Sequence, residues 1–326
     1  MIPYRGPSQQ RGVALIIALV LMALATILAV KIGFGGYVER KRTSSILAAE
    51  QAYQFAMGAE ALAATALKDD DPAVDHLAES WAQAPQPIPL RPPNDPEGEP
   101  LGTLEGSLED QAGRFNINNL LRKLQDGKPD PVPLKQFQEL LSALSLDPKW
   151  AELTRDWVDD DSDVSFPDGA EDAVYSSQVP PYRTGNYPLL STSELMNLPG
   201  FGVENFRKLA PYITALPEFT KINTCTAPGY ILDALTNTRE FTSDPEFLVK
   251  SRKNSGCFPM NKDLASRFPE GPQRKEFLDQ LTQNSDYFRL TTIVTLGSTE
   301  FTLYSLLRRD PSSRSVTPIL RSFGTP

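Results

Sequence analysis

The sequence predicts an α+β protein in which a long N-terminal helix packs on an antiparallel sheet, with a large all-helical domain inserted between the strands. Residues 13–68 contain no proline and are rich in Ala and Leu. Residues 120–217 repeat apolar side chains at helical spacing, whereas residues 287–310 alternate apolar and polar side chains as strands do. Because helical sequence separates the strand-like segments, we expect a single sheet interrupted by an insertion.

These patterns divide the chain into five segments. They are a leader (1–12), a stem helix (13–68), a first part of the α/β domain (69–119), a helical insertion of SAM-like or helix–hairpin–helix-like character (120–217), and a second part of the α/β domain that ends in a β-hairpin (218–326). The first and second parts are expected to contribute strands to the same sheet.

The composition excludes several classes of protein. The 326 residues carry 32 Lys and Arg against 41 Asp and Glu, a net charge of −9 at pH 7, and the pI is near 4.9. Such a chain is a poor nucleic-acid binder, because phosphate contacts need clustered cations. A single histidine, His76, and two cysteines exclude His-rich metal sites, zinc ribbons and iron–sulfur clusters.

One uncharged apolar run, residues 13–30, is long enough to cross a membrane. As a helix its 18 residues span roughly 27 Å, close to the thickness of a hydrocarbon core. Arg5 and Arg11 precede the run and Lys31 follows it, so the basic residues do not fix its orientation. Helix-forming sequence continues where a signal-peptide cleavage site would stand, which favours an uncleaved anchor.

The stem is predicted to continue as an amphipathic helix to residue 68. Residues on one of its faces recur every three or four positions: Ile46, Ala49, Tyr53, Ala56 and Glu60. Joined to the apolar run, this helix covers about 55 residues and about 80 Å. Gly33, Gly35 and Gly36 are the expected place for a kink or local melting.

The segment after the stem predicts a connection and then strands. Residues 69–100 are rich in proline and acids and are expected to be solvated. Residues 101–117 alternate apolar positions and are expected to be extended. The string GRFNINNL at 113–120 ends this extended part, and we expect Asn118 or Asn119 to cap the next helix.

Within the insertion, residues 134–146 and 149–160 have helical periodicity, and residues 191–217 read as helix, turn and helix. The turn Leu198-Pro-Gly-Phe-Gly202 resembles the hairpin of helix–hairpin–helix DNA-binding modules. The negative charge of the chain opposes DNA binding, so a packed structural hairpin is favoured.

The strongest chemical signal is an acidic loop at residues 159–172. Its candidate metal ligands are Asp159, Asp161, Asp163, Glu171 and Asp172. Carboxylate oxygens without His or Cys favour Ca²⁺, which tolerates irregular coordination. The spacing does not match an EF-hand, and a solvated loop without an ion is the alternative.

Residues beyond 217 predict a helix at 228–238 and a β-hairpin at 287–310 that turns at residues 297–299. This hairpin and the strands before the insertion would complete the antiparallel sheet.

A short basic leader that ends in Gly12, followed at once by an apolar segment and an amphipathic extension, resembles a class III, type IV prepilin-like signal. In that family a prepilin peptidase cuts after the glycine, here between Gly12 and Val13. The resemblance implies that the apolar segment stays on the mature protein and packs in a helical filament. It also implies a pilin-like fold for the helix and sheet.

Most pilins and pseudopilins carry Glu at the fifth mature position, which here is Ile17. In those families the Glu pairs with the terminal amine of a neighbouring subunit and so sets the stacking register. Its absence resembles the K-type minor pseudopilin family of type II secretion systems. The GRFNINNL string and residues 222–227, INTCTA, are also similar to segments of that family.

The resemblance implies a non-enzymatic subunit at the pseudopilus tip, which initiates or caps assembly for the export of folded proteins across the outer membrane. Its implied partners are I- and J-type minor pseudopilins, other pseudopilins, the prepilin peptidase and the inner-membrane secretion platform. Residues 13–30 would form a single inner-membrane span, with the C-terminal domain in the periplasm and bound calcium in the acidic loop. In the periplasm Cys225 and Cys257 can form a disulfide, with two free thiols as the alternative.

Two other functions fit parts of the sequence. A DNA-uptake or type IV pilus minor pilin would use the hairpin at 198–202, and a membrane-anchored periplasmic hydrolase would use the acidic loop. The first requires DNA binding, and the second requires activity that is lost with single Asp substitutions.

Overall fold

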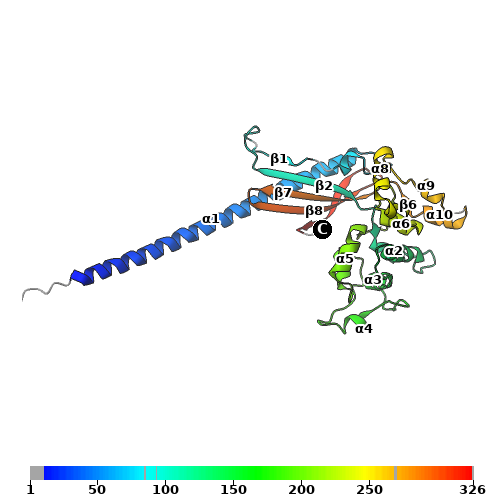
Figure 1. The fold of residues 1–326 in the computed structure, drawn as a ribbon, viewed down its shortest axis with the longest axis horizontal. Coiled ribbons are helices and arrows are strands. Elements are labelled where there is room, and N and C mark those ends of the chain that lie inside the picture. The colour runs from blue at the N-terminus through cyan, green and yellow to red at the C-terminus, as the bar shows by residue number, and fades with distance from the viewer. Residues whose placement is uncertain (1–10, 84–85, 93, 268–269, 325–326) are drawn as a thin grey trace, which may run out of the picture.

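A computed structural model of the chain describes residues 11–83, 86–92, 94–267 and 270–324. The first ten residues of the expected leader therefore lie outside the described residues. Helix α1 (Arg11–Asp69) extends from one end of a five-stranded sheet, and a mass of short helices lies at the other end of that sheet (Figure 1).

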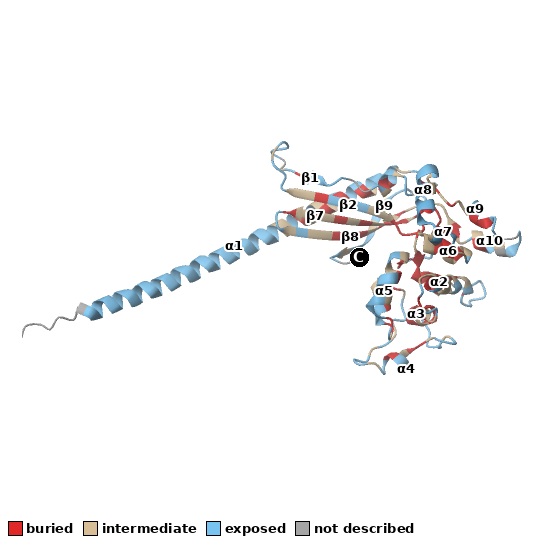
Figure 2. Ribbon diagram, viewed as in Figure 1, coloured by how far each residue is buried: buried red, intermediate tan, exposed pale blue. Residues whose placement is uncertain are grey.

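Helix α1 has an exposed first half and a packed second half (Figure 2). Residues 12–46 are exposed, whereas a row of small and apolar residues in the second half is buried. The buried row comprises Ala52, Ala56, Ala59, Ala63 and Leu67. The helix is continuous through Gly33, Gly35 and Gly36, so the local melting that we expected there is absent from the described helix. The Ala- and Leu-rich segments 13–30 and 43–68, on the two sides of the glycine region, sustain it.

The sheet is antiparallel, with strand order β1-β2-β7-β8-β9. Its strands are β1 (Ile88–Leu90), β2 (Gly102–Asp110), β7 (Tyr287–Leu296), β8 (Thr299–Arg309) and β9 (Val316–Phe323). The predicted hairpin is present as β7 and β8. Strands β1 and β9, which we did not predict, form the two edges.

The second half of α1 covers this sheet through two apolar clusters. The small residues of α1 let the helix lie close to Leu104, Val294 and Leu303 in the first cluster. In the second, Leu67 packs with residues of the sheet and with Trp81, whose ring meets Phe288 edge-on at 5.2 Å between centroids. Trp81 belongs to a short 3₁₀ helix, η1 (Ser80–Ala82). The connection 69–100 is therefore partly buried, contrary to our expectation of a solvated segment.

One buried carboxylate fixes α1 on the sheet. Glu60 is only 5% exposed. It accepts two hydrogen bonds of 2.8 Å from Arg321 on β9 and one of 2.6 Å from Ser305 on β8. Burial tends to raise the pKa of Glu60, but these bonds outweigh it and hold the pKa below its ordinary value. The hydrogen bonds of Glu60 thus fix the position of α1 along the sheet.

The helical insertion comprises residues 111–286, between β2 and β7, which are hydrogen-bonded neighbours in the sheet. Its first part contains β3 (Phe115–Asn116), η2 (Ile117–Leu121), α2 (Pro131–Ala143), α3 (Trp150–Val158), α4 (Asp172–Tyr175), η3 (Thr192–Asn197), α5 (Gly202–Leu209), η4 (Ala210–Tyr212) and β4 (Ile213–Thr214). Its second part contains β5 (Ile222–Asn223), α6 (Gly229–Thr236), α7 (Glu240–Ser243), α8 (Pro245–Ser255), α9 (Asn261–Ala265), α10 (Pro272–Leu278) and β6 (Leu281–Thr282).

The insertion is larger than the predicted 120–217. One apolar core runs from Phe115 to Leu281 and joins side chains of α2 and α3 to those of α6 and α7. Phe115 and Phe137 stack in this core with centroids 5.1 Å apart. The predicted boundary between 217 and 218 therefore falls inside a continuous core, because the helices that follow it pack on the helices that precede it.

Candidate functional site

The acidic loop, residues 159–172, follows α3 and ends at the first residue of α4, at the far end of the insertion (Figure 1). It brings together Asp159, Asp161 and Glu171, each of which offers one carboxylate oxygen within 4.8 Å of the other two. Glu171 is only 5% exposed and stands immediately before α4. Three of the five predicted ligands thus converge.

The end of α3 shapes this loop. The buried Asp156 accepts a 2.9 Å bond from the amide of Ser165, and Glu152 accepts a 3.0 Å bond from the amide of Asp168. A side chain at Gly169 would collide with the Asp156 carboxylate and the Ser165 backbone, so only glycine fits there. These contacts close the loop and hold its two ends together. Asp156, which lies within α3, was not among the predicted ligands.

The electrostatics of the loop favour a cation. Asp156 Oδ1, Asp159 Oδ1 and Glu171 Oε1 are buried and have no hydrogen-bond partner among the described residues. Burial first, and then the neighbouring carboxylates, raise the pKa values of Asp159 and Glu171 to about 7. A divalent cation would satisfy these oxygens and remove the repulsion, and their hard, purely oxygen chemistry fits Ca²⁺. Asp159, Asp161 and Glu171 would hold the ion.

Two predicted ligands lie outside this cluster. Asp163 is exposed, and it is linked to the loop by its amide, which donates to Asp161 Oδ1 at 2.8 Å. Asp172 instead accepts bonds of 3.0 and 2.9 Å from the amide and hydroxyl of Thr184. The bonds from Thr184 lower the pKa of Asp172. Its carboxylate is therefore already satisfied by protein donors.

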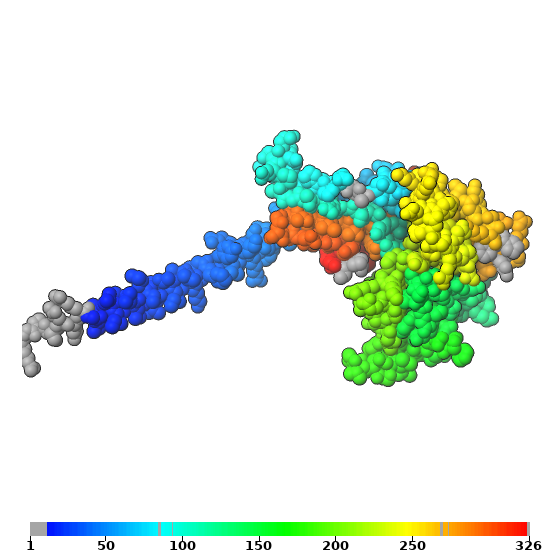
Figure 3. Space-filling view, viewed as in Figure 1, coloured from blue at the N-terminus to red at the C-terminus, as the bar shows by residue number. Residues whose placement is uncertain are grey.

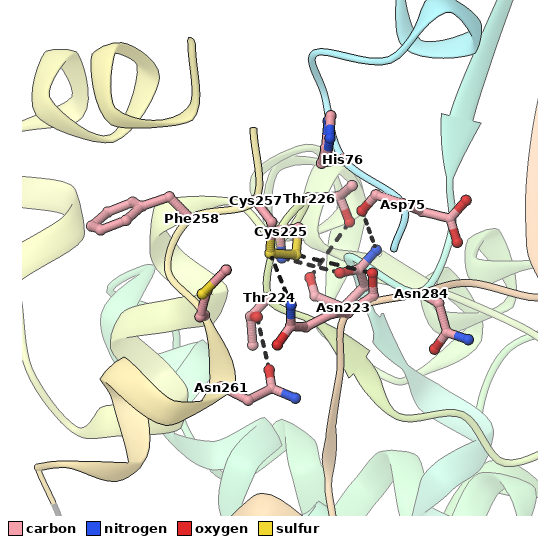
Figure 4. Close-up of a disulfide and its surroundings, with 12 residues drawn as sticks. Asp75, His76, Asn223, Thr224, Cys225, Thr226, Cys257, Phe258, Asn261 and Asn284 are labelled. Carbon is pink, nitrogen blue, oxygen red and sulfur yellow. Dashed lines mark hydrogen bonds between the residues drawn. A yellow bond between two sulfur atoms is a disulfide. The ribbon is translucent and has the colours of Figure 1, made fainter. Parts of the chain in front are cut away.

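The predicted disulfide between Cys225 and Cys257 is present, with Cα atoms 4.4 Å apart (Figure 4). It joins Cys225, in the segment before α6, to Cys257, which follows Gly256, the C-terminal cap of α8. Both cysteines are buried, at 0% and 5% exposure. The bond thus closes the second part of the insertion next to the sheet.

The asparagine cluster, Asn116, Asn118 and Asn119 of the GRFNINNL string, has a role that our capping prediction missed. Asn116 is the residue that caps η2. Asn118 donates to the carbonyl oxygens of Leu189 and Leu216 and accepts from the amide of Leu189. Asn119 exchanges hydrogen bonds with the backbone of Thr220. The cluster therefore ties the start of the insertion to loops that lie 71 to 101 residues further along the chain.

The hairpin at 198–202 is part of the core. Leu198 and Phe201 are 1% and 2% exposed. The ring of Phe201 meets Trp150 edge-on, with centroids 5.1 Å apart. Arg207, one of the cations near this hairpin, pairs with Glu204 at 3.0 Å. These contacts describe the packed structural hairpin that the sequence favoured.

The stem has the composition of a membrane span. An 18-residue window of α1 reaches a mean hydropathy of 3.1 with no buried residue. Gly12 and Val13 lie in the first turn of α1, and Ile17 is 54% exposed on its surface. The first acidic residue of the whole chain is Glu39, so the apolar part of the stem contains no carboxylate.

Comparisons with known proteins agree with these features. A family model described as Type II secretion system (T2SS), protein K matches residues 113–218. The chain is 32% identical to the type II secretion system protein K of Aeromonas hydrophila over 94% of this chain and 96% of that protein. The identity to protein K of Pseudomonas aeruginosa is also 32%, over 92% and 89% of the two chains. The chain belongs to the type II secretion system protein K family.

The fold of this protein K family member also has a counterpart among solved structures. It is similar to a chain in the crystal structure of the GspK–GspI–GspJ complex from the enterotoxigenic Escherichia coli Type 2 Secretion System. The TM-score is 0.69 and the identity 24%, over 87% of this chain and 100% of that chain. The region matched by the family model starts at Gly113, the first residue of the GRFNINNL string, and includes the acidic loop.

Proposed function

We propose that this K-family protein is the minor pseudopilin at the tip of the type II secretion pseudopilus. There it initiates or caps assembly with I- and J-type minor pseudopilins, for the export of folded proteins across the outer membrane. The observation that carries the proposal is the position of the insertion at the end of the sheet remote from the start of α1. The solved complex of the related GspK with GspI and GspJ supports the choice of partners.

The insertion sits where a further subunit would have to stack. In a filament whose subunits lie side by side along their stems, the next subunit is displaced along the direction of α1. The space-filling view (Figure 3) shows the insertion projecting from the far end of the head, by which we mean the sheet and the insertion together. The insertion extends well beyond the width of the stem (Figure 3). A subunit placed above this one would collide with that mass, whereas subunits placed below it meet only the stem and the sheet.

The stem supplies a second reason for a terminal position. A subunit that enters beneath another needs a group to neutralise the terminal amine above it, because an unpaired charge in hydrocarbon is costly. Ile17 and its apolar neighbours provide no such group. The first subunit of a filament has no amine above it and therefore does not need one.

The proposed role also implies how the chain is cleaved and in which compartment it lies. The prepilin peptidase would cut between Gly12 and Val13, and residues 13–30 would anchor the chain in the inner membrane beside the secretion platform. The head would lie in the periplasm, an oxidising compartment in which the Cys225–Cys257 disulfide persists. In this setting we propose that Asp159, Asp161 and Glu171 bind a structural calcium ion.

The proposal is tested by counting copies of the full-length chain in assembled pseudopili. Wild type is expected at one copy per filament. An Ile17→Glu variant gains a carboxylate that can pair with an amine above it, so it should compete for entry beneath other subunits. Because its insertion collides with the subunit above, such entry should shorten the filaments rather than add copies to the shaft. Ile16→Glu places the same charge on another side of α1 and controls for impaired membrane insertion. Unchanged filament length in Ile17→Glu would contradict the argument from the stem, and more than one copy per filament would contradict the argument from the insertion.

A further inference from the structure

A second group of carboxylates lies far from the acidic loop, in the connection that follows α1. Asp70, Asp75 and Glu79 each place one carboxylate oxygen within 4.8 Å of the other two. Asp70 directly follows the last residue of α1, and Glu79 directly precedes η1. The group therefore lies where the stem helix ends and the head begins.

The surrounding protein holds these side chains in place. The amide of Asp75 donates to Gln283 at 2.8 Å, and the Asp75 carbonyl accepts from Asn223 at 3.0 Å. Figure 4 shows the Asp75 carboxylate directed away from the disulfide. Glu79 Oε2 accepts a 2.6 Å bond from the indole of Trp81 and a 3.0 Å bond from the amide of His76. The carboxylates are thus positioned before any ligand binds.

Two carboxylate oxygens of this group accept no hydrogen bond from the described residues. Asp75 is fully buried; its Oδ2 accepts from the amide of Ser285 and from Arg309. Its Oδ1 has no hydrogen-bond partner in the described parts of the chain. The same holds for Asp70 Oδ2, which lies 3.6 Å from Nη1 of Arg309. A buried carboxylate oxygen without a donor needs a cation or a proton.

The charges in this group do not balance. Arg309 is 2% exposed and contributes one positive charge against three carboxylates. His76 lies beside the group, with its Nε2 3.7 Å from Glu79. Asp110 and Asp71 add further negative charge next to Asp75 and Asp70. The group therefore carries an excess of negative charge, which a divalent cation would reduce.

We propose that Asp70, Asp75 and Glu79 form a second divalent-cation site, independent of the acidic loop, which binds Ca²⁺. Carboxylate oxygens in an irregular arrangement suit Ca²⁺ better than Mg²⁺, which requires near-octahedral geometry. Because Asp70 adjoins α1 while Asp75 bonds to the insertion and, through Arg309, to β8, the ion would fasten the end of the stem to the head.

The site is tested by counting calcium ions on the full-length, detergent-solubilised protein with native mass spectrometry, at about 1 mM free calcium. Wild type is expected to bind two ions. The double variant Asp70→Asn/Glu79→Gln keeps hydrogen-bond acceptors at both positions and leaves the Asp75–Arg309 pair intact, and it should lose one ion. The matched variant Asp159→Asn/Glu171→Gln should lose the other.

Melting in EGTA checks that both variants fold, and each should melt at or above the wild-type temperature because repulsion has been removed. Two results would overturn the proposal. One is a wild-type protein that binds no ion, or one ion that only the Asp159→Asn/Glu171→Gln variant loses. The other is an Asp70→Asn/Glu79→Gln variant that retains the wild-type number of ions. Neither result bears on whether the chain occupies the pseudopilus tip.

Discussion

Replacing Glu171 by Gln should stabilise the metal-free protein and abolish the part of its stabilisation by calcium that comes from the acidic loop. The substitution keeps the size of the side chain and removes one charge from the cluster with Asp159 and Asp161. Without metal, the Glu171 carboxylate is repelled by those of Asp159 and Asp161. With calcium bound, the same carboxylate is a ligand of the ion. The sign of the stability change should therefore reverse between the two conditions.

The structure sets the size of both effects. The carboxylate oxygens lie within 4.8 Å of one another, and at that limit two charges repel by about 3 kcal/mol at an effective dielectric constant near 20 and by about 1 kcal/mol in water. We therefore expect Glu171→Gln to gain about 1–3 kcal/mol without metal. Calcium at 100 times its dissociation constant stabilises wild type by about 2.7 kcal/mol. Loss of this contribution should make the calcium-induced rise in melting temperature several degrees smaller in the variant than in wild type.

The assay is thermal melting of full-length protein, followed by tryptophan fluorescence, in EGTA and in calcium. Asp163→Asn is the matched control, because Asp163 is exposed and outside the cluster. It should keep the wild-type response to calcium. Equal calcium responses in wild type and Glu171→Gln would refute the assignment of Glu171 as a ligand.

The same cluster predicts a dependence on pH. Asp159 and Glu171 have pKa values of about 7 in the metal-free fold, above their ordinary values, so their protonated forms stabilise the fold. The stability of the metal-free protein should therefore fall as pH rises through 7. Protons and calcium compete for the same oxygens, so the calcium-induced rise in melting temperature should be larger at pH 8 than at pH 5.5. A rise that did not change with pH would contradict this.

Three further substitutions test the packing of the head. Glu60→Gln breaks the bonds from Arg321 and should cost about 2–4 kcal/mol in denaturant unfolding at pH 7. The difference should shrink in acid, as the pH falls through the lowered pKa of Glu60 and its own carboxylate becomes protonated. Asn118→Leu leaves buried backbone groups unpaired and should cost about 2–4 kcal/mol; an unchanged midpoint would show that the asparagine cluster is dispensable. Cys225→Ser should cost about 3–4 kcal/mol, and reductant should destabilise wild type but not this variant.

Local patterns were sufficient to predict much of the fold. The stem helix, the hairpin of β7 and β8 and the helices of the insertion all carry their apolar periodicity within a single segment. The edge strands carry no such periodicity. Strand β1 is three residues long with Pro89 at its centre, and β9 contains Pro318. A proline removes a hydrogen-bond donor and is tolerated mainly at sheet edges, so such strands resemble loops in sequence.

Distant partners account for what the sequence did not predict. Asp75 and Trp81 belong to a proline-rich connection that we expected to be solvated, yet Arg309 and Phe288 bury them from more than 200 residues away. At the acidic loop, composition indicated the ligand type but not which carboxylates converge. Asp172 leaves the cluster because Thr184 offers it two donors, a contact that no local pattern records.

The most direct test of the account is to locate the chain on assembled pseudopili. A gold-binding tag placed at the exposed C-terminal side of the sheet, after β9, would mark each copy for electron microscopy. If the insertion prevents another subunit from stacking above it, a single mark should appear at one end of every labelled filament. Marks distributed along the shaft would contradict the account.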